Sequence, residues 1–194
     1  FSMILIFTGT TDLTWAPEIS STLTLAPGIY TYLFAVGLVV MYFFKITLVS
    51  GAAAMTLFGF SALYAAVAGV PYFLDSEIPA AVFLGLHLLI TDPSTSPRTP
   101  LGKTLFGILY GIGVFALYTI LGYFGEPTLY DKLLCVPLLN LSVIAIDRLV
   151  RRFNSESLLN LWNPAWLGGR GNLAHMAVWI GVFSLMSLLG RTDA

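Results

Sequence analysis

Long apolar runs separated by short polar stretches form the dominant pattern of this chain. A helix needs roughly 20 apolar residues to cross about 30 Å of hydrocarbon. Four runs come close to that length or exceed it, at 26–44, 46–70, 101–124 and 129–149. A last run, 174–189, is shorter, but a bilayer adapts to a few Å of mismatch. The pattern therefore predicts an all-α integral membrane protein.

The run at 80–90 differs from the others, because it is too short to cross on its own. It leads into the polar sequence TDPSTSPRTP at 91–100. The prolines lack an amide donor, and each disfavours helical backbone in the residue before it. We expect helix to about Ile90 and an extended path through 91–96 at membrane depth. The third of about six transmembrane segments is then a broken half-helix.

Charge sets the expected orientation, since short loops rich in Lys and Arg stay in the cytoplasm. If Lys45 is cytoplasmic, the alternation of segments places seven of the nine Lys and Arg residues on that side. These are Lys45, Arg98, Lys103, Arg148, Arg151, Arg152 and Arg170. The acidic residues Asp75, Glu77, Glu126 and Asp131 then fall outside. The charge pattern therefore predicts six crossings, and the broken segment is one of them.

Composition supports the same class, with a mean hydropathy of +0.87 and 57% hydrophobic residues against 10% charged residues. The net charge of −1 offers no basic surface for a phosphate backbone, so nucleic acid is excluded as a partner. The single cysteine, Cys135, excludes an internal disulfide, a four-cysteine iron–sulfur cluster and a cysteine-built zinc site. We predict no metal site in this chain.

The broken stretch supplies the first candidate site residues. Non-helical backbone at membrane depth must face protein, water or a ligand, because lipid cannot satisfy its polar groups. The stretch carries Asp92 with the hydroxyls of Thr91, Thr95 and Ser96, and an intramembrane carboxylate is a functional-site hypothesis by default. Alternatively, Asp92 caps a turn by accepting backbone N–H bonds, and the two interpretations are compatible. We take all four as candidate cofactor-binding residues.

His87 is a fifth candidate, one helical turn before the break. Its ring can reach the same cavity as Asp92, where the two would form a proton-relay pair. The alternative is a neutral histidine hydrogen-bonded to a neighbouring helix.

Arg98 and Lys103 complete the candidate site, because they flank the start of the next helix. Thr99 is the expected N-cap of that helix, with Pro100 at its first position. A helix N-terminus favours an anion such as a phosphate group. Cations are expected on that side from topology as well, so both explanations stay open.

The same stretch resembles a known family. Residues 91–102 strongly resemble its TDP-x-TSP-x-TP-x-G sequence, 105–113 its glycine-rich helix, and Leu138–Leu141 with Ile146–Arg148 its LLMN…IDR ending. The family, RnfD/NqrB, unites a membrane protein of Rnf electron-transport complexes with one of the sodium-pumping NADH:quinone oxidoreductase. The resemblance covers about residues 26–153, which correspond to the second of the family's two bundles of about five helices, containing broken helices.

The resemblance implies a function. Family complexes of the bacterial cytoplasmic membrane move electrons from NADH or ferredoxin to a quinone or second carrier, coupled to sodium or proton transport. Family members carry FMN on a threonine of an S/D-G-A-T motif in the half missing here, and further flavin non-covalently. We therefore expect a multi-pass subunit of an ion-translocating oxidoreductase. Its expected cofactor is non-covalent FMN or riboflavin, and its expected partners are other membrane subunits, lipid and a quinone.

Two departures favour an alternative. Ser50–Ala53 imitates the flavin-attachment motif but has Ala53 in place of the threonine, so we interpret it as small-residue helix packing, like Gly107-x-x-x-Gly111. The family also normally ends near Arg152, whereas this chain continues with an interfacial segment and a further helix. The alternative is a non-catalytic structural subunit of a larger respiratory or photosynthetic complex; a channel or transporter ranks below both.

The chain is thereby divided into four regions. Phe1 begins what looks like the tail of an apolar segment, so we expect an upstream region. The regions are an extracytoplasmic segment at 1–25, the RnfD/NqrB-like bundle at 26–153, an interfacial segment at 154–173 and an extra C-terminal helix at 174–194.

Overall fold

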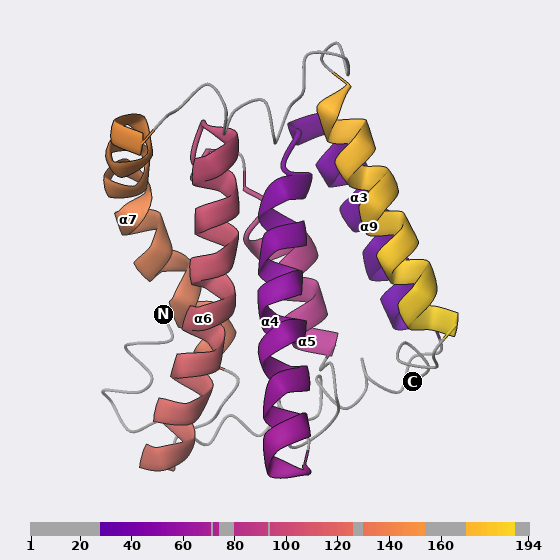
Figure 1. Ribbon diagram of the computed structural model, residues 1–194, viewed down its shortest axis with the longest axis vertical. Coiled ribbons are helices and arrows are strands. Elements are labelled where there is room, and N and C mark those ends of the chain that lie inside the picture. Colours follow the sequence, from indigo (N-terminus) through magenta and orange to yellow (C-terminus); the bar gives the residue numbers. More distant parts are fainter. Residues whose placement is uncertain are drawn as a thin grey trace.

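The computed structural model describes residues 28–70, 72–73, 80–92, 94–125, 130–153 and 170–188, and every regular element within them is a helix (Figure 1). The elements are α3 (Ile29–Phe44), α4 (Thr47–Ala68), α5 (Ala80–Leu84), the π-helix η1 (Gly85–Leu89), α6 (Pro100–Phe124), α7 (Tyr130–Phe153) and α9 (Gly171–Leu188). The predicted segment 1–25 and most of 154–173 lie outside the described residues.

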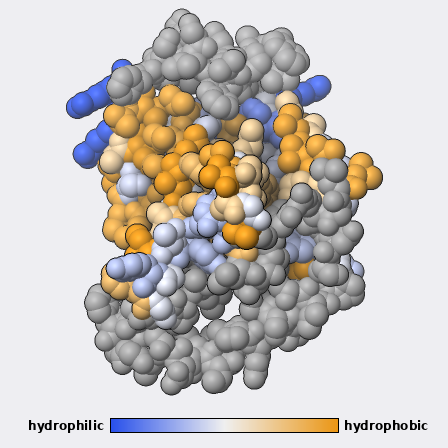
Figure 2. All heavy atoms as spheres, turned by 60° about the horizontal axis from the view of Figure 1, so that its bottom comes forward, coloured by the Kyte–Doolittle hydropathy of each residue, from blue (hydrophilic) through white to orange (hydrophobic). Residues whose placement is uncertain are grey.

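The predicted helical membrane class is supported by three helices. α4, α6 and α9 are each long and apolar enough to cross a membrane, whereas α3 is shorter at 16 residues. Large apolar side chains point outward, with Val67, Tyr123 and Leu141 each more than 80% exposed. Figure 2 shows hydrophobic residues gathered over much of the described surface on one face of the bundle. An apolar exterior of this kind needs lipid or protein to cover it.

The helices run alternately up and down, which brings the cations together at one end. The Lys103 Nζ donates to the Lys45 carbonyl (2.8 Å), and the Arg98 amide donates to Asp147 Oδ1 (3.3 Å). These bonds join the start of α6 to the end of α3 and to the last turns of α7. We call this the cationic end of the bundle; it carries Lys45, Arg98, Lys103, Arg148, Arg151, Arg152 and Arg170. The arrangement is the one that the charge pattern predicted for the cytoplasmic side.

The turn between α3 and α4 is a tight one. Lys45 ends α3 in the left-handed conformation (φ 55°), and its amide donates to the Met41 carbonyl at 3.0 Å. A lysine rarely adopts this conformation, which usually belongs to glycine at a helix C-terminus. The Lys103 ammonium offsets the cost of this conformation, because it donates to the Lys45 carbonyl at the end of α3, where the helix dipole favours a cation.

α4 and α6 make the most extensive helix–helix contact in the bundle. A Cβ atom at Gly107 would overlap the Val49 carbonyl oxygen and come within 2.9 Å of the Ala52 Cβ. At Gly111 it would lie 2.7 Å from the Thr56 Cβ. Glycine thus allows the two backbones to touch, which confirms the predicted small-residue packing of both segments.

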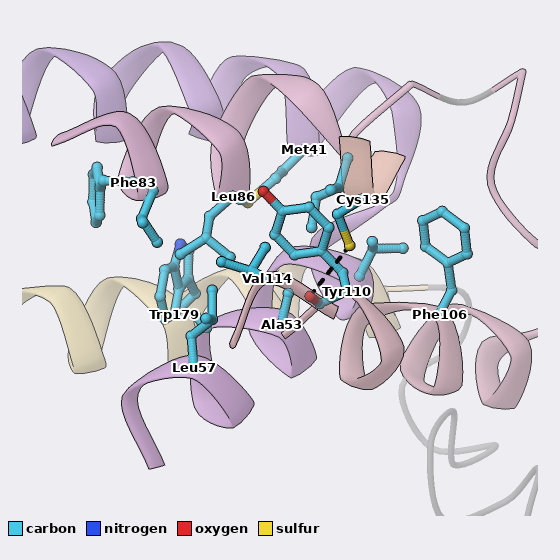
Figure 3. Close-up of a cluster of buried hydrophobic side chains, with 14 of the residues drawn as sticks. Met41, Ala53, Leu57, Phe83, Leu86, Phe106, Tyr110, Val114, Cys135 and Trp179 are labelled. Atoms are coloured by element: carbon cyan, nitrogen blue, oxygen red, sulfur yellow. Dashed lines mark hydrogen bonds between the residues drawn. The ribbon is translucent and has the colours of Figure 1, made fainter. Parts of the chain in front are cut away.

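The core lies between these helices and the broken segment (Figure 3). Its centre is formed by fully buried side chains of α3 to α6, including Met41, Phe83, Leu86, Phe106 and Tyr110. Cys135 of α7 is buried beside them, and its thiol donates to the Tyr110 carbonyl at 3.6 Å. α7 changes direction along its length and contains Pro137, which cannot donate a backbone hydrogen bond (Figure 1).

α9 is tied into the bundle rather than lying beside it. The Asn172 Nδ2 donates to the Met41 carbonyl, and its Oδ1 accepts from the Thr47 hydroxyl, both at 3.0 Å. One side chain thereby links the start of α9 to the end of α3 and the start of α4. The helix begins at Gly171, three residues before the predicted start at 174.

Replacing Asn172 with alanine is expected to lower the free energy of unfolding by about 1–2 kcal/mol, because two partly buried hydrogen bonds are lost. The matched control is Ser184→Ala in the same helix, whose exposed hydroxyl bonds only the Ile180 carbonyl. Unfolding of the purified protein in micelles by increasing SDS, followed by circular dichroism, measures both. Equal stability of the two variants would contradict the anchoring role of Asn172.

Candidate functional site

The broken segment ends in a wide turn. The Ile90 amide donates to the Gly85 carbonyl at 3.2 Å, a five-residue spacing that defines the π-helix. The buried Thr91 hydroxyl then donates to the His87 carbonyl at 2.8 Å, satisfying an acceptor that the end of the helix leaves open. The predicted end of the helix at about Ile90 is confirmed. π-turns inside helices are frequent at functional sites.

After the helix, the chain folds around Asp92. The Asp92 Oδ1 accepts from the Ser94 amide at 3.0 Å, and the Ser94 hydroxyl donates to both carboxylate oxygens at 2.7 Å. The Thr95 hydroxyl donates to Oδ2 at 3.2 Å, and the Ser96 hydroxyl donates to the Asp92 carbonyl at 3.0 Å. The predicted extended path is therefore replaced by consecutive turns. Three short hydroxyl side chains make the turns more favourable than extension, since each bonds the same aspartate.

Asp92 itself is exposed, as is Ser94, while Thr95 and Ser96 are half-buried. The carboxylate therefore accepts from its own loop and still faces outward. This is the capping geometry that sequence reasoning left open. A carboxylate has about four acceptor positions, and only three protons point to this one, from the Ser94 amide, the Ser94 hydroxyl and the Thr95 hydroxyl. One position is left for a donor from outside the chain.

His87 points away from this loop, into the core. Its Nδ1 lies 2.8 Å from the Phe83 carbonyl, and its Nε2 lies 3.2 Å from the indole nitrogen of Trp179. A carbonyl only accepts and an indole N–H only donates, so the ring is neutral with its proton on Nδ1. These contacts match the alternative prediction for His87, a neutral histidine hydrogen-bonded to a neighbouring helix, here α9.

Close packing fixes the His87 ring in place. A Cβ atom at Gly37 of α3 would overlap the ring and lie 2.8 Å from the His87 Cβ. Phe34 meets the ring edge-on, with centroids 5.9 Å apart. The structure therefore does not bring His87 and Asp92 together, because α3 and α9 hold the imidazole on the other side.

Arg98 and Lys103 stand at the start of α6, as predicted. The Thr99 Oγ1 accepts from the Gly102 amide at 3.0 Å, with Pro100 at the first position of the helix, so the predicted cap is confirmed. The Arg98 side chain is exposed, whereas the half-buried Lys103 reaches the Lys45 carbonyl. Arg98 is thus the cation better placed to meet an external anion.

Asp147 is a site residue that sequence reasoning did not select. Its Oδ1 accepts from the Arg98 amide at 3.3 Å and would lie 3.3 Å from a Cβ atom at Gly102. The contact joins two of the segments that carry the family resemblance, the loop and the IDR ending. Their presence in one resemblance was the available clue to this contact.

The loop offers an exposed anion, Asp92, and an exposed cation, Arg98. Asp92 can accept from a donor group, and Arg98 can bind a phosphate or another anion next to the positive end of the α6 dipole. Within the described residues, no group of three or more His, Cys, Asp or Glu side chains gathers that could hold a metal ion. Comparisons with protein-family models, with curated proteins and with solved structures find no match.

Proposed function

We propose that the chain is a multi-pass subunit of an electron-transport complex in the bacterial cytoplasmic membrane, resembling the RnfD/NqrB proteins. In this proposal the loop at 91–99 holds FMN or riboflavin non-covalently, and the complex passes electrons towards a quinone with coupled ion movement. One observation supports it most. The broken helix presents a preorganised polar loop, built on Asp92, at the cationic end of an otherwise apolar bundle.

The chemistry of a flavin suits this surface. The ring system carries N–H donors and carbonyl acceptors, which would pair with the Asp92 carboxylate and the loop hydroxyls. The phosphate of FMN would lie by Arg98 at the α6 N-terminus, where dipole and charge both favour an anion. Because the turns are already formed, little ordering entropy opposes binding.

The proposal includes six crossings, with the cationic end in the cytoplasm. The broken segment at 80–99 crosses as one of them and leads into the start of α6 at the cationic end. The other subunits of the complex would cover the exposed apolar surface that lipid does not.

A second candidate function is a structural subunit without a cofactor. The observation that favours it is the internal satisfaction of the candidate residues. Asp92 accepts from Ser94 and Thr95, both ring nitrogens of His87 have partners, and Lys103 bonds Lys45. A loop that needs no ligand for its own stability can serve as a rigid joint between helices.

Asp92→Asn and Thr95→Val in the assembled complex separate the two functions. If the loop binds flavin, we expect flavin content and turnover to fall by about tenfold or more, the loss expected for a hydrogen bond to a charged group. The free energy of unfolding of Asp92→Asn should change by only about 1 kcal/mol or less, since Asn caps nearly as well as Asp. Flavin absorbance and fluorescence per chain, with the turnover of the complex, are the measurements.

Thr119→Val, an identical change at an exposed threonine of α6, is the control for Thr95→Val. Normal flavin content and turnover in both loop variants would overturn flavin binding by the loop and favour the structural subunit. A wild-type complex without flavin would have the same meaning.

A further inference from the structure

A cavity of about 470 Å³ is lined by residues of α4, α6 and α9. Its volume is in the range of small-molecule sites. Met55 and Val178 line it and are 74% and 67% exposed, so the cavity opens on the outer face of the bundle. In a membrane this opening faces the lipid.

Most polar residues of the lining lie at one end of the cavity, and the other end is apolar except for Thr56. Thr47 is the first residue of α4, and Thr104 and His175 lie in the second turns of α6 and α9. All three therefore lie towards the cationic end. The lining one to two turns further along each helix includes the apolar Met55, Ile108 and Val182. At about 1.5 Å per residue, α4 rises roughly 12 Å from Thr47 to Met55. This gradient fits an amphipathic guest with its polar head towards the cationic end.

The threonine hydroxyls determine which polar head fits. Thr47 donates its proton to the Asn172 Oδ1 at 3.0 Å, and Thr104 donates to the Pro100 carbonyl at 3.0 Å. Thr56, deeper in the cavity, donates to the Ala52 carbonyl at 2.8 Å. A hydroxyl has one proton but two lone pairs, so each oxygen keeps a lone pair that can accept a hydrogen bond from a guest. A guest that only accepts hydrogen bonds gains nothing from these three groups.

Trp179 also lines the cavity, and its donor proton is also used within the protein. Its indole N–H already donates to His87 Nε2, so the group that it offers to a guest is the apolar ring surface. Flat or chain-like apolar groups pack well against such a surface.

We propose that this cavity binds a lipid-soluble alcohol or phenol, with its hydroxyl donating to the threonine oxygens at the cationic end. The apolar body of the ligand packs against Trp179 and the deeper lining. The site uses none of the loop residues at 91–99, so it stands whether or not the chain carries flavin.

Gly51 offers a direct way to block the cavity. It lines the cavity, and a Cβ atom added there would meet no atom within 4 Å. Gly51→Leu should therefore fill the space without a clash in the bundle. Gly59→Leu is the matched control, because Gly59 lies in the same helix, a Cβ atom there also meets nothing within 4 Å, and Gly59 is not part of the lining.

The test is saturable binding of two radiolabelled probe pairs to the purified protein in nanodiscs. The first pair is para-octylphenol and para-octylanisole, which differ in the hydroxyl proton being replaced by a methyl group. The second is dioctanoylglycerol and its methyl ether, which represents a lipid source of the same hydroxyl chemistry. We expect at least one hydroxyl probe to bind about 3- to 10-fold more tightly than its ether, the range of one net hydrogen bond.

Gly51→Leu should abolish this saturable binding, and Gly59→Leu should retain it. Thr104→Val should bring the affinity of the hydroxyl probe to that of its ether, with Thr119→Val as control. Selective binding of the phenol, the glyceride or both supports the site and identifies the source. Equal binding of alcohol and ether, unchanged binding in Gly51→Leu, or no saturable binding by either hydroxyl probe would overturn it.

Discussion

Gly107→Ala is expected to lower the free energy of unfolding by about 2–3 kcal/mol, whereas the same change at Gly122 of the same helix should not destabilise the protein. The added Cβ at Gly107 would overlap the Val49 carbonyl and lie 3.0 Å from the Ala53 nitrogen. Both are backbone atoms of α4, which cannot rotate away as a side chain can. The helices must therefore separate along the most extensive contact of the bundle.

Gly122 makes the control stringent, because a Cβ atom there meets nothing within 4 Å. The intrinsic preference of helices for alanine then favours Gly122→Ala by up to about 1 kcal/mol. SDS-induced unfolding in mixed micelles, followed by circular dichroism, gives both values. Similar stability of the two variants would show that α4 and α6 are not in backbone contact.

Trp179→Phe is expected to cost about 2–4 kcal/mol, for two separable reasons. The smaller ring leaves a void in the core. The change also leaves the Nε2 of the fully buried His87 without the indole donor. The second loss depends on the histidine, so it should vanish when His87 is replaced by leucine.

A double-mutant cycle over His87→Leu and Trp179→Phe isolates that loss. We expect a coupling of about 1–3 kcal/mol, since Trp179→Phe made in the His87→Leu background leaves no ring nitrogen unsatisfied. Coupling below about 0.5 kcal/mol, the limit of additivity for independent sites, would exclude the hydrogen bond between the two rings.

Features set by local chemistry were predictable from the sequence. The start of α6 follows from Thr99 and Pro100, because a cap needs only neighbouring residues. The end of the broken helix follows from its prolines, and the small residues of α4 and α6 indicate close packing. The position of the candidate loop, between the broken helix and the start of α6, was therefore predictable as well.

Features set by distant contacts were not predictable. His87 and Trp179 are 92 positions apart, and no pattern in the sequence pairs them. The turns around Asp92 were predicted as an extended path, because proline spacing argues against a helix. That spacing does not reveal that Ser94 and Thr95 both bond the Asp92 carboxylate. The π-helix changes the residues per turn over five residues, which apolar periodicity cannot resolve.

The anchoring of α9 has a consequence for biosynthesis. Chains fold from the N-terminus as they leave the ribosome, and α9 is the last of the described helices to emerge. Until then, His87 Nε2 lacks its donor and the Thr47 hydroxyl lacks its acceptor inside the bilayer. Insertion of the earlier helices and completion of the core are thus separate events. The interval between them is when membrane quality-control proteases would recognise an unfinished chain.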